Sequence, residues 1–281
     1  MTLPTQVGVY GGGRMGAGIA HALVLGGALV TVIESSAESS EAARRRIETS
    51  LTHAADRGAL PEGVASALDR VVVSADPAHL SGCGLVVEAV PEHTALKKQV
   101  LAVIEDVAPT AWVATNTSSL SVDDLASCLA RPERFLGLHF FNPVPASRLV
   151  EIVVGAATAV ELVDLARSWV AVLGKTAITV TDSPGFASSR LGVAIALEAM
   201  RMLEEGVASA EDIDTAMELG YKHPAGPLRT TDLVGLDVRL AIAEHLAREV
   251  DNRFAPPAIL RELVAAGHLG RKSGQGFYTW P

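Results

Sequence analysis

The sequence predicts an α/β protein in which a doubly wound, mostly parallel sheet is followed by an all-helical domain. Short apolar segments alternate with amphipathic helical patterns over the first 183 residues. This alternation ends at the turn-forming DSPG (182–185), and only helical patterns follow it. A glycine-rich turn joins the first apolar segment to the first helical pattern, as in nucleotide-binding sheets.

The first domain is expected to alternate strands and helices. Most of its short segments are continuously apolar, as strands covered on both faces are. We expect strands at 6–10, 28–34, 71–74, 84–90, 112–116, 135–140, 149–154 and 177–180. Helical patterns occupy 14–25, 38–58, 62–69, 94–107, 121–130 and 158–173.

A domain boundary is predicted near Ser183. It separates a strand-and-helix domain at 1–183 from a helical domain at 184–281, and 281 residues suffice for both. Helices are expected in the second domain at 186–205, 209–219, 235–250 and 256–267.

Composition narrows the classes of function. The net charge of −9 disfavours a nucleic-acid surface. No apolar run is long enough to cross a bilayer, and MTLPTQVGVY lacks a signal-peptide pattern, so we expect no membrane partner. Cys83 and Cys128 are the only cysteines, which favours a reducing cytoplasm, and no metal-ligand spacing is present. The apolar content of 49% hints at a buried subunit interface.

The segment VGVYGGGRMGAGIA (7–20) is typical of a dinucleotide-binding turn. Gly11 permits the tight turn, Gly13 lets the backbone approach a pyrophosphate, and Gly16 lets the helix pack against the strand. Arg14 and Met15 lie in the same turn and are further expected cofactor contacts. The alternative is a glycine-rich turn that binds no cofactor.

Glu34 is the last residue of the second predicted strand, 23 residues after Gly11. A carboxylate there accepts hydrogen bonds from a ribose 2′-hydroxyl and repels a 2′-phosphate. No arginine follows within the next residues, so the sequence favours NAD over NADP.

Two ionisable residues occur in GLHFFNPVPASRLVEIV (137–153). His139 lies near the end of one predicted strand and Glu151 near the start of the next, where it could hydrogen-bond the imidazole. Ends of parallel strands face the ligand crevice, and TNTSSLS (115–121) brings hydroxyl groups to the same edge. The pair is either a proton-transfer dyad or a buried structural contact.

The chain resembles the short-chain 3-hydroxyacyl-CoA dehydrogenases, which include 3-hydroxybutyryl-CoA dehydrogenases, over nearly its whole length. The resemblance is carried by GGGRMGAGIA, VVEAVPEHTALK, NTSSLS, GLHFFNPVP, RLVEIV, DSPGF, GLDVRL and GRKSGQGFY. It implies a Rossmann-like NAD-binding domain and a helical domain for homodimerisation and substrate binding. It also implies reversible, NAD-dependent oxidation of a (3S)-3-hydroxyacyl-CoA to the 3-oxoacyl-CoA.

The resemblance also implies residue roles. His139 matches the family's catalytic histidine, Glu151 its carboxylate partner, and Ser118 the serine that contacts the substrate hydroxyl and the nicotinamide region. The remaining expected cofactor contacts are Glu92, Lys97, Asn142 and Lys272.

Position 189 departs from the family pattern. The family commonly has an asparagine that contacts substrate just before the arginine of its PGF segment, whereas PGFASSR (184–190) carries Ser189. A serine hydroxyl can still bond the thioester carbonyl directly or through water, so Ser189 is kept as a site residue.

The sequence is compatible with three functions that differ in substrate or in catalysis. Arg44, Arg45 and Arg46 are either a basic surface for the phosphates of CoA or a solvated helix face. A dehydrogenase of a free 3-hydroxy acid or of an acyl-carrier-protein substrate is the nearest alternative. A non-catalytic dinucleotide-binding protein is the third.

Overall fold

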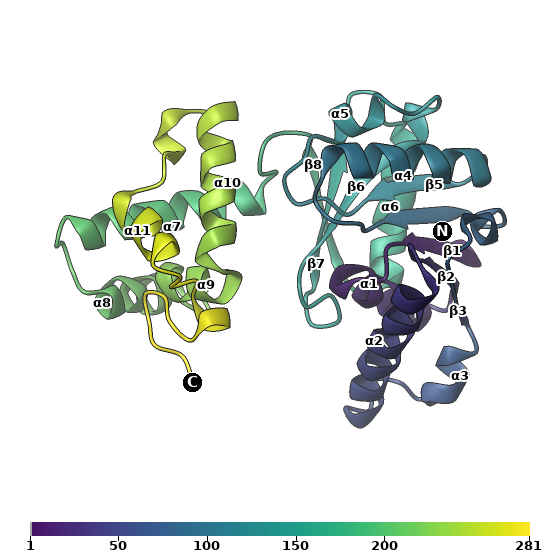
Figure 1. Ribbon diagram of the computed structural model, residues 1–281, viewed down its shortest axis with the longest axis horizontal. Coiled ribbons are helices and arrows are strands. Elements are labelled where there is room, and N and C mark those ends of the chain that lie inside the picture. The colour runs from purple at the N-terminus through teal and green to yellow at the C-terminus, as the bar shows by residue number, and fades with distance from the viewer. Residues whose placement is uncertain (1) are drawn as a thin grey trace. The chain divides into compact units, whose positions relative to one another are not determined.

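One eight-stranded sheet organises the first part of the computed structural model, which describes residues 2–281 (Figure 1). Its strand order is β3-β2-β1-β4-β5-β6-β7-β8. The order reverses direction between β1 and β4, so the sheet is doubly wound, as predicted. The strands are β1 (Gln6–Tyr10), β2 (Leu29–Ile33), β3 (Val71–Ser74), β4 (Leu85–Glu88), β5 (Trp112–Thr115), β6 (Phe135–Phe140), β7 (Leu149–Val154) and β8 (Thr176–Thr181).

The neighbouring strands are parallel except for β6 and β7, which pair antiparallel. Residues 141–148 join these two strands directly, a connection too short for a helical crossover. The antiparallel register sets His139 directly opposite Glu151.

Helices cover both faces of the sheet. On one face α1 (Arg14–Leu25), α2 (Ala37–Asp56) and α6 (Val160–Val172) share a hydrophobic core with alternate strand residues. The intervening strand residues point the other way, where α4 (Thr94–Val107) contacts β4 and β5, and α5 (Val122–Ala126) contacts β6. A short α3 (Val64–Leu68) precedes β3. Helices on both faces bury the central strands, which explains why most of the strands are continuous runs of apolar residues.

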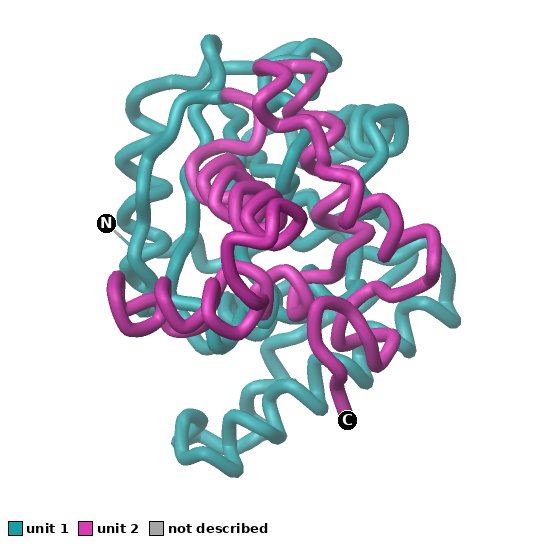
Figure 2. The backbone as a smooth tube through the Cα atoms, turned by 90° about the vertical axis from the view of Figure 1, so that its left-hand side faces the viewer, with its two compact units in different colours: residues 1–182 teal, residues 183–281 magenta. Residues whose placement is uncertain are grey.

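The chain divides into two units, the first ending at Asp182 and the second beginning at Ser183 (Figure 2). The second unit contains α7 (Ser188–Glu204), α8 (Ala210–Thr215), α9 (Pro227–Val234), α10 (Leu236–Glu249) and α11 (Ala258–Ala265). These helices have a core of their own, built around residues such as Leu197, Met200 and Leu246. The predicted fold class is thus confirmed.

Helix α9 was not predicted from the sequence. This helix begins with Pro227 after the extended residue Gly226, a favourable start because proline lacks the N–H that a first helical turn leaves unbonded. Its eight residues include Thr230 and Thr231, which weaken the helical pattern. Among residues 2–281, no helix is long and apolar enough to cross a membrane.

Candidate active site

The glycine turn connects β1 to α1 where the strand order reverses. Gly11 has a φ of 100°, and a Cβ there would lie 2.8 Å from the carbonyl oxygen of Ala89, just beyond β4. A Cβ on Gly16 would lie 1.7 Å from the carbonyl oxygen of Gly11. Glycine is therefore required at both positions by contacts within the protein.

At Gly13, neither the backbone conformation nor the packing within the protein requires a glycine. Its φ is −63°, and a Cβ there would meet no protein atom within 4 Å. Gly13 is also the N-cap of α1. It has no side chain to accept a hydrogen bond from the first N–H groups of the helix, and the first turn carries no acidic residue. The turn thus offers open backbone and a positive helix end, which fit the pyrophosphate of a dinucleotide. Arg14 is exposed beside it and Met15 is half-buried.

Glu34 follows β2 and reaches back to the glycine turn. Its Oε1 accepts the Gly12 N–H at 2.7 Å, and its Oε2 accepts the Ser35 N–H at 3.2 Å. The Nη1 of Arg46 donates to the carbonyl oxygen of Gly12 at 3.3 Å. The acid that the sequence predicted for ribose binding therefore lies against the turn that would hold the pyrophosphate.

His139 and Glu151 are buried together on β6 and β7. The Nδ1 of His139 lies 2.7 Å from the Oε2 of Glu151, and the two side chains are 8% and 0% exposed. The imidazole also packs against the Phe141 ring, with ring centroids 4.4 Å apart. A carboxylate at Nδ1 fixes the ring orientation and places a hydrogen on that nitrogen, which directs proton exchange to Nε2.

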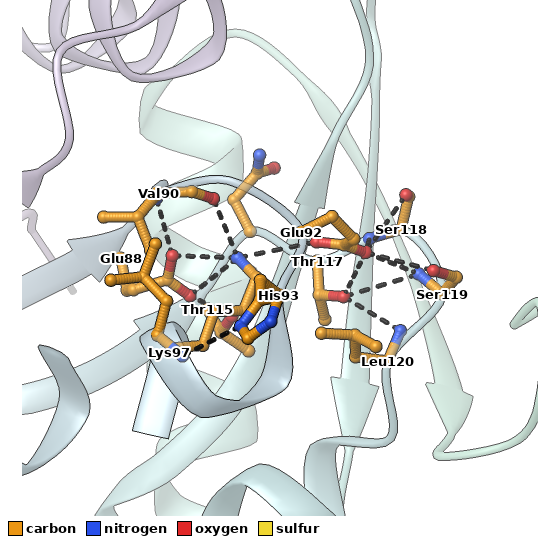
Figure 3. Close-up of polar contacts among 12 residues, drawn as sticks. Glu88, Val90, Glu92, His93, Lys97, Thr115, Thr117, Ser118, Ser119 and Leu120 are labelled. Carbon is orange, nitrogen blue, oxygen red and sulfur yellow. Dashed lines mark hydrogen bonds and ion pairs between the residues drawn. The ribbon is translucent and has the colours of Figure 1, made fainter. Parts of the chain in front are cut away.

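A buried ion pair supports the loop after β4 (Figure 3). The Nζ of Lys97 lies 2.8 Å and 2.9 Å from the two carboxylate oxygens of Glu88, and both side chains are fully buried. Glu88 also accepts hydrogen bonds from Thr115 Oγ1 and from the Val90 N–H. Both oxygens of the buried Glu88 carboxylate are thus paired, and its bond from Thr115 joins the carboxyl ends of β4 and β5.

Glu92 connects this ion pair to the NTSSLS segment. Its Oε2 lies 3.5 Å from the Nζ of Lys97, and its Oε1 accepts the Thr117 hydroxyl at 2.6 Å and the Ser118 N–H at 2.9 Å. Ser119 donates to the same oxygen through its N–H and hydroxyl. Burial raises the pKa of Glu92, but the Lys97 charge and these hydrogen bonds outweigh it, so the net pKa is lowered. An ionised Glu92 therefore holds Ser118 in place (Figure 3).

The structure brings two groups of the predicted site residues together. Glu92, Lys97 and Ser118 form one, and His139 and Glu151 form the other, with Asn116 between their strands because its Oδ1 accepts the Phe140 N–H at 3.0 Å. Asn142 is exposed just after β6.

Ser189 and Lys272 lie in the second unit. Ser189 is half-buried in the first turn of α7. The Nζ of Lys272 contacts both carboxylate oxygens of Asp237 at 2.5 and 2.6 Å. The segment that carries Lys272 is anchored by the buried Asp232, which accepts hydrogen bonds from Phe277, Tyr278 and Trp280.

The roles of Glu88, Thr115 and Thr117 were not predicted from the sequence. A signal for Glu88 was available, because it is the one charged residue within the apolar run GLVVEAV. A charge inside a strand of a covered sheet requires a partner, and Lys97 lies nine residues on, in the next helix.

Comparison with known proteins places these features in a family. A family model described as the 3-hydroxyacyl-CoA dehydrogenase NAD-binding domain matches residues 6–183, and one described as its C-terminal domain matches residues 185–280. The chain is 41% identical over 283 residues to a 3-hydroxybutyryl-CoA dehydrogenase of Mycobacterium tuberculosis, covering 98% of each chain. It is 39% identical over 277 residues to a probable 3-hydroxybutyryl-CoA dehydrogenase of Deinococcus radiodurans, covering 98% of this chain and 100% of that one. A solved structure of (S)-3-hydroxybutyryl-CoA dehydrogenase from Ralstonia eutropha matches with a TM-score of 0.94, 38% identity and 99% coverage of both chains.

Proposed function

The chain belongs to the 3-hydroxyacyl-CoA dehydrogenase family and is an NAD-dependent dehydrogenase, and we propose that it interconverts a (3S)-3-hydroxyacyl-CoA and the 3-oxoacyl-CoA, with 3-hydroxybutyryl-CoA as a substrate. The observation that carries this proposal is the buried contact between His139 and Glu151 at 2.7 Å. A buried histidine oriented by a carboxylate suits the acceptance and return of a hydroxyl proton.

The proton follows a defined route in this proposal. In the oxidation direction, Nε2 of His139 accepts the proton of the substrate 3-hydroxyl while C3 gives up its hydride. The Glu151 carboxylate stabilises the imidazolium that forms, as carboxylates do in other histidine–acid pairs. In the reduction direction, the imidazolium returns the proton to the 3-oxo oxygen.

Bound NAD supplies the hydride acceptor. We assign its pyrophosphate to Gly11, Gly13 and the N–H groups at the start of α1, and its ribose hydroxyls to Glu34. The other proposed cofactor contacts are Arg14, Met15, Glu92, Asn142 and Lys272, and the buried Lys97 serves cofactor binding by holding Glu92. The open backbone at Gly13 supports this assignment.

Two serines orient the substrate in this proposal. Ser118, held by Glu92, positions the 3-hydroxyl beside the nicotinamide, and Ser189 bonds the thioester carbonyl. Holding C3 in place is the protein's main contribution to rate, since the redox chemistry belongs to the cofactor.

The second unit is proposed to form a cytoplasmic homodimer. Large apolar side chains are exposed on its helices α7, α9 and α10, and exposed apolar groups of this kind are typical of a surface that binds another protein. They are Leu191, Ile195, Leu233, Val234 and Val238. Light scattering of the purified chain should give twice the 29.2 kDa of one copy. A mass of one copy at micromolar concentration would contradict the dimer.

The function is tested by mixing the protein with NADH and acetoacetyl-CoA and following absorbance of the reduced nicotinamide. NADPH and free acetoacetate form parallel arms. Oxidation of NADH with the thioester alone is the expected result. Turnover of free acetoacetate would favour a free-acid dehydrogenase. Binding of NADH without turnover of the thioester would favour a carrier-protein substrate or a non-catalytic role.

A further inference from the structure

The core-facing side of α10 carries one charged residue. Its buried residues are Leu236, Arg239, Ala243 and Leu246, which recur at the three- and four-residue spacing of a face turned toward a core. Arg239 is only 8% exposed. A guanidinium thus occupies a position where the pattern predicts an apolar side chain.

Arg239 has no compensating acid among residues 2–281. It forms no ion pair there, and its fully buried Nε–H has no hydrogen-bond acceptor. Burial lowers the pKa of Arg239, yet an arginine in a protein stays protonated. Buried charges are normally paired, so an uncompensated one costs stability and indicates a ligand that supplies the missing anion.

The guanidinium lies against α7 at a residue that leaves it room. A Cβ on Gly192 would come within 3.4 Å of Nη1 and 3.8 Å of Nη2 of Arg239. Ser189 precedes Gly192 by three residues and therefore lies on the same side of α7, one turn closer to its start. The α7 residue beside the guanidinium is thus one helical turn from Ser189, the serine that we propose binds the thioester carbonyl.

We infer that Arg239 binds a carboxylate at the far end of the substrate's acyl chain, so that the enzyme prefers 3-hydroxyacyl-CoA thioesters with a second, terminal acid group. This inference rests on the proposed function, because it assigns α7 to the acyl site. The planar guanidinium matches a carboxylate with two parallel hydrogen bonds. The other buried residues of α10 are apolar and Arg239 itself is only 8% exposed, which suits a narrow chain end better than the phosphates of a nucleotide.

The test compares two substrates of equal shape, 3-oxoadipyl-CoA and its neutral terminal amide, each with NADH. We expect the wild type to favour the carboxylate by at least about tenfold in kcat/KM, the value of one charged hydrogen-bonded pair. Arg239→Gln should bring the ratio of the two substrates close to one. Arg248→Gln removes an exposed charge from the same helix and should leave the ratio unchanged.

Three results would overturn the inference. The wild type could treat acid and amide alike. Arg239→Gln could lower kcat/KM for the acid and for the amide equally, as expected if Arg239 has a purely structural role. The dependence on Arg239 could instead disappear with 3′-dephospho-CoA thioesters, which would assign the charge to the CoA phosphate.

Two further measurements keep the inference testable. Arg239→Met should raise the melting temperature of the ligand-free protein because it removes an uncompensated buried charge. A lowered melting temperature with a change in oligomeric state would assign Arg239 to a contact between copies and overturn the inference. If no thioester is turned over, the proposed function fails separately. Calorimetric binding of 3-oxoadipyl-CoA and its amide to wild type and Arg239→Gln then decides the role of Arg239.

Discussion

Glu151 lies directly opposite His139 in the antiparallel pair β6–β7, and its Oε2 is 2.7 Å from the histidine Nδ1. Twelve residues separate them in the chain, yet cross-strand register makes them neighbours. Both are buried on a rigid sheet, so neither side chain must be ordered when substrate binds. This arrangement underlies the first prediction.

Replacing either member of this pair should impair the chemical step. We expect His139→Ala to lower kcat by at least about 10²-fold, and Glu151→Gln to lower it as well because the imidazolium loses its counter-charge. NAD affinity, measured by fluorescence titration, should change little. Glu161→Gln, at an exposed position of α6, is the matched control. Unchanged turnover in His139→Ala would remove this histidine from the mechanism.

Glu34 should set the choice between NAD and NADP. Glu34→Ser removes the acceptor for ribose hydroxyls and the charge that repels a 2′-phosphate, so KM for NADH should rise about tenfold and the preference over NADPH should narrow. Steady-state kinetics with both cofactors measures this. The same substitution at exposed Glu38 should change neither value. If Glu34→Ser keeps the wild-type preference for NADH over NADPH, residues other than Glu34 discriminate between the two cofactors.

Lys97 and Glu88 should depend on each other for stability. Lys97→Met leaves the Glu88 carboxylate buried without its counter-ion and should cost about 3–5 kcal/mol of unfolding free energy. Adding Glu88→Gln should recover part of that loss, because an amide oxygen still accepts the Val90 N–H.

The neighbouring Lys98 provides the control for this pair. It lies 2.7 Å from Asp124 at the surface, so Lys98→Met should cost about 1 kcal/mol or less of unfolding free energy, with urea titration as the measurement for all of these variants. Equal losses at positions 97 and 98 would contradict the assigned importance of the buried pair.

His21 should make the first unit sensitive to acid. Burial, followed by the charges of Arg57 and Lys175, lowers the pKa of His21 from 6.5 to about 4. Its Nδ1 lies 2.7 Å from the Ser50 hydroxyl, and its side chain is 1% exposed. The unfolded chain therefore binds a proton at a higher pH than the folded chain does.

Stability should consequently fall as pH drops from about 6.5 to about 4, with a full effect on the order of 3 kcal/mol. Above this window His21 is neutral in both states and contributes no pH dependence. His21→Gln should flatten the profile of unfolding free energy between pH 6.5 and 4, while His53→Gln, at an exposed position of α2, should not. Parallel profiles for wild type and His21→Gln would disprove the assignment.

The sequence by itself determined most of the secondary structure and the sheet class. Strands β1, β3, β6 and β7 and helices α1 and α4 begin and end where periodicity and turn residues indicate, because each buries a continuous or amphipathic apolar pattern. The glycine turn and the acid after β2 were also readable, since local conformation requires glycine at Gly11 and Gly16. The short α9 was missed because its threonines and few turns give a weak local signal.

Tertiary structure alone decided which polar groups meet. The antiparallel pairing of β7 makes Glu151 the partner of His139, and sheet order brings Glu92 to Ser118 across β4 and β5. The helical pattern of α10 predicted an apolar stripe, whereas only packing revealed that Arg239 lies in it without a counter-charge. Periodicity specifies which face of an element is buried. The side chains that pack against that buried face depend on strand order and register, and both of these involve residues far apart in the chain.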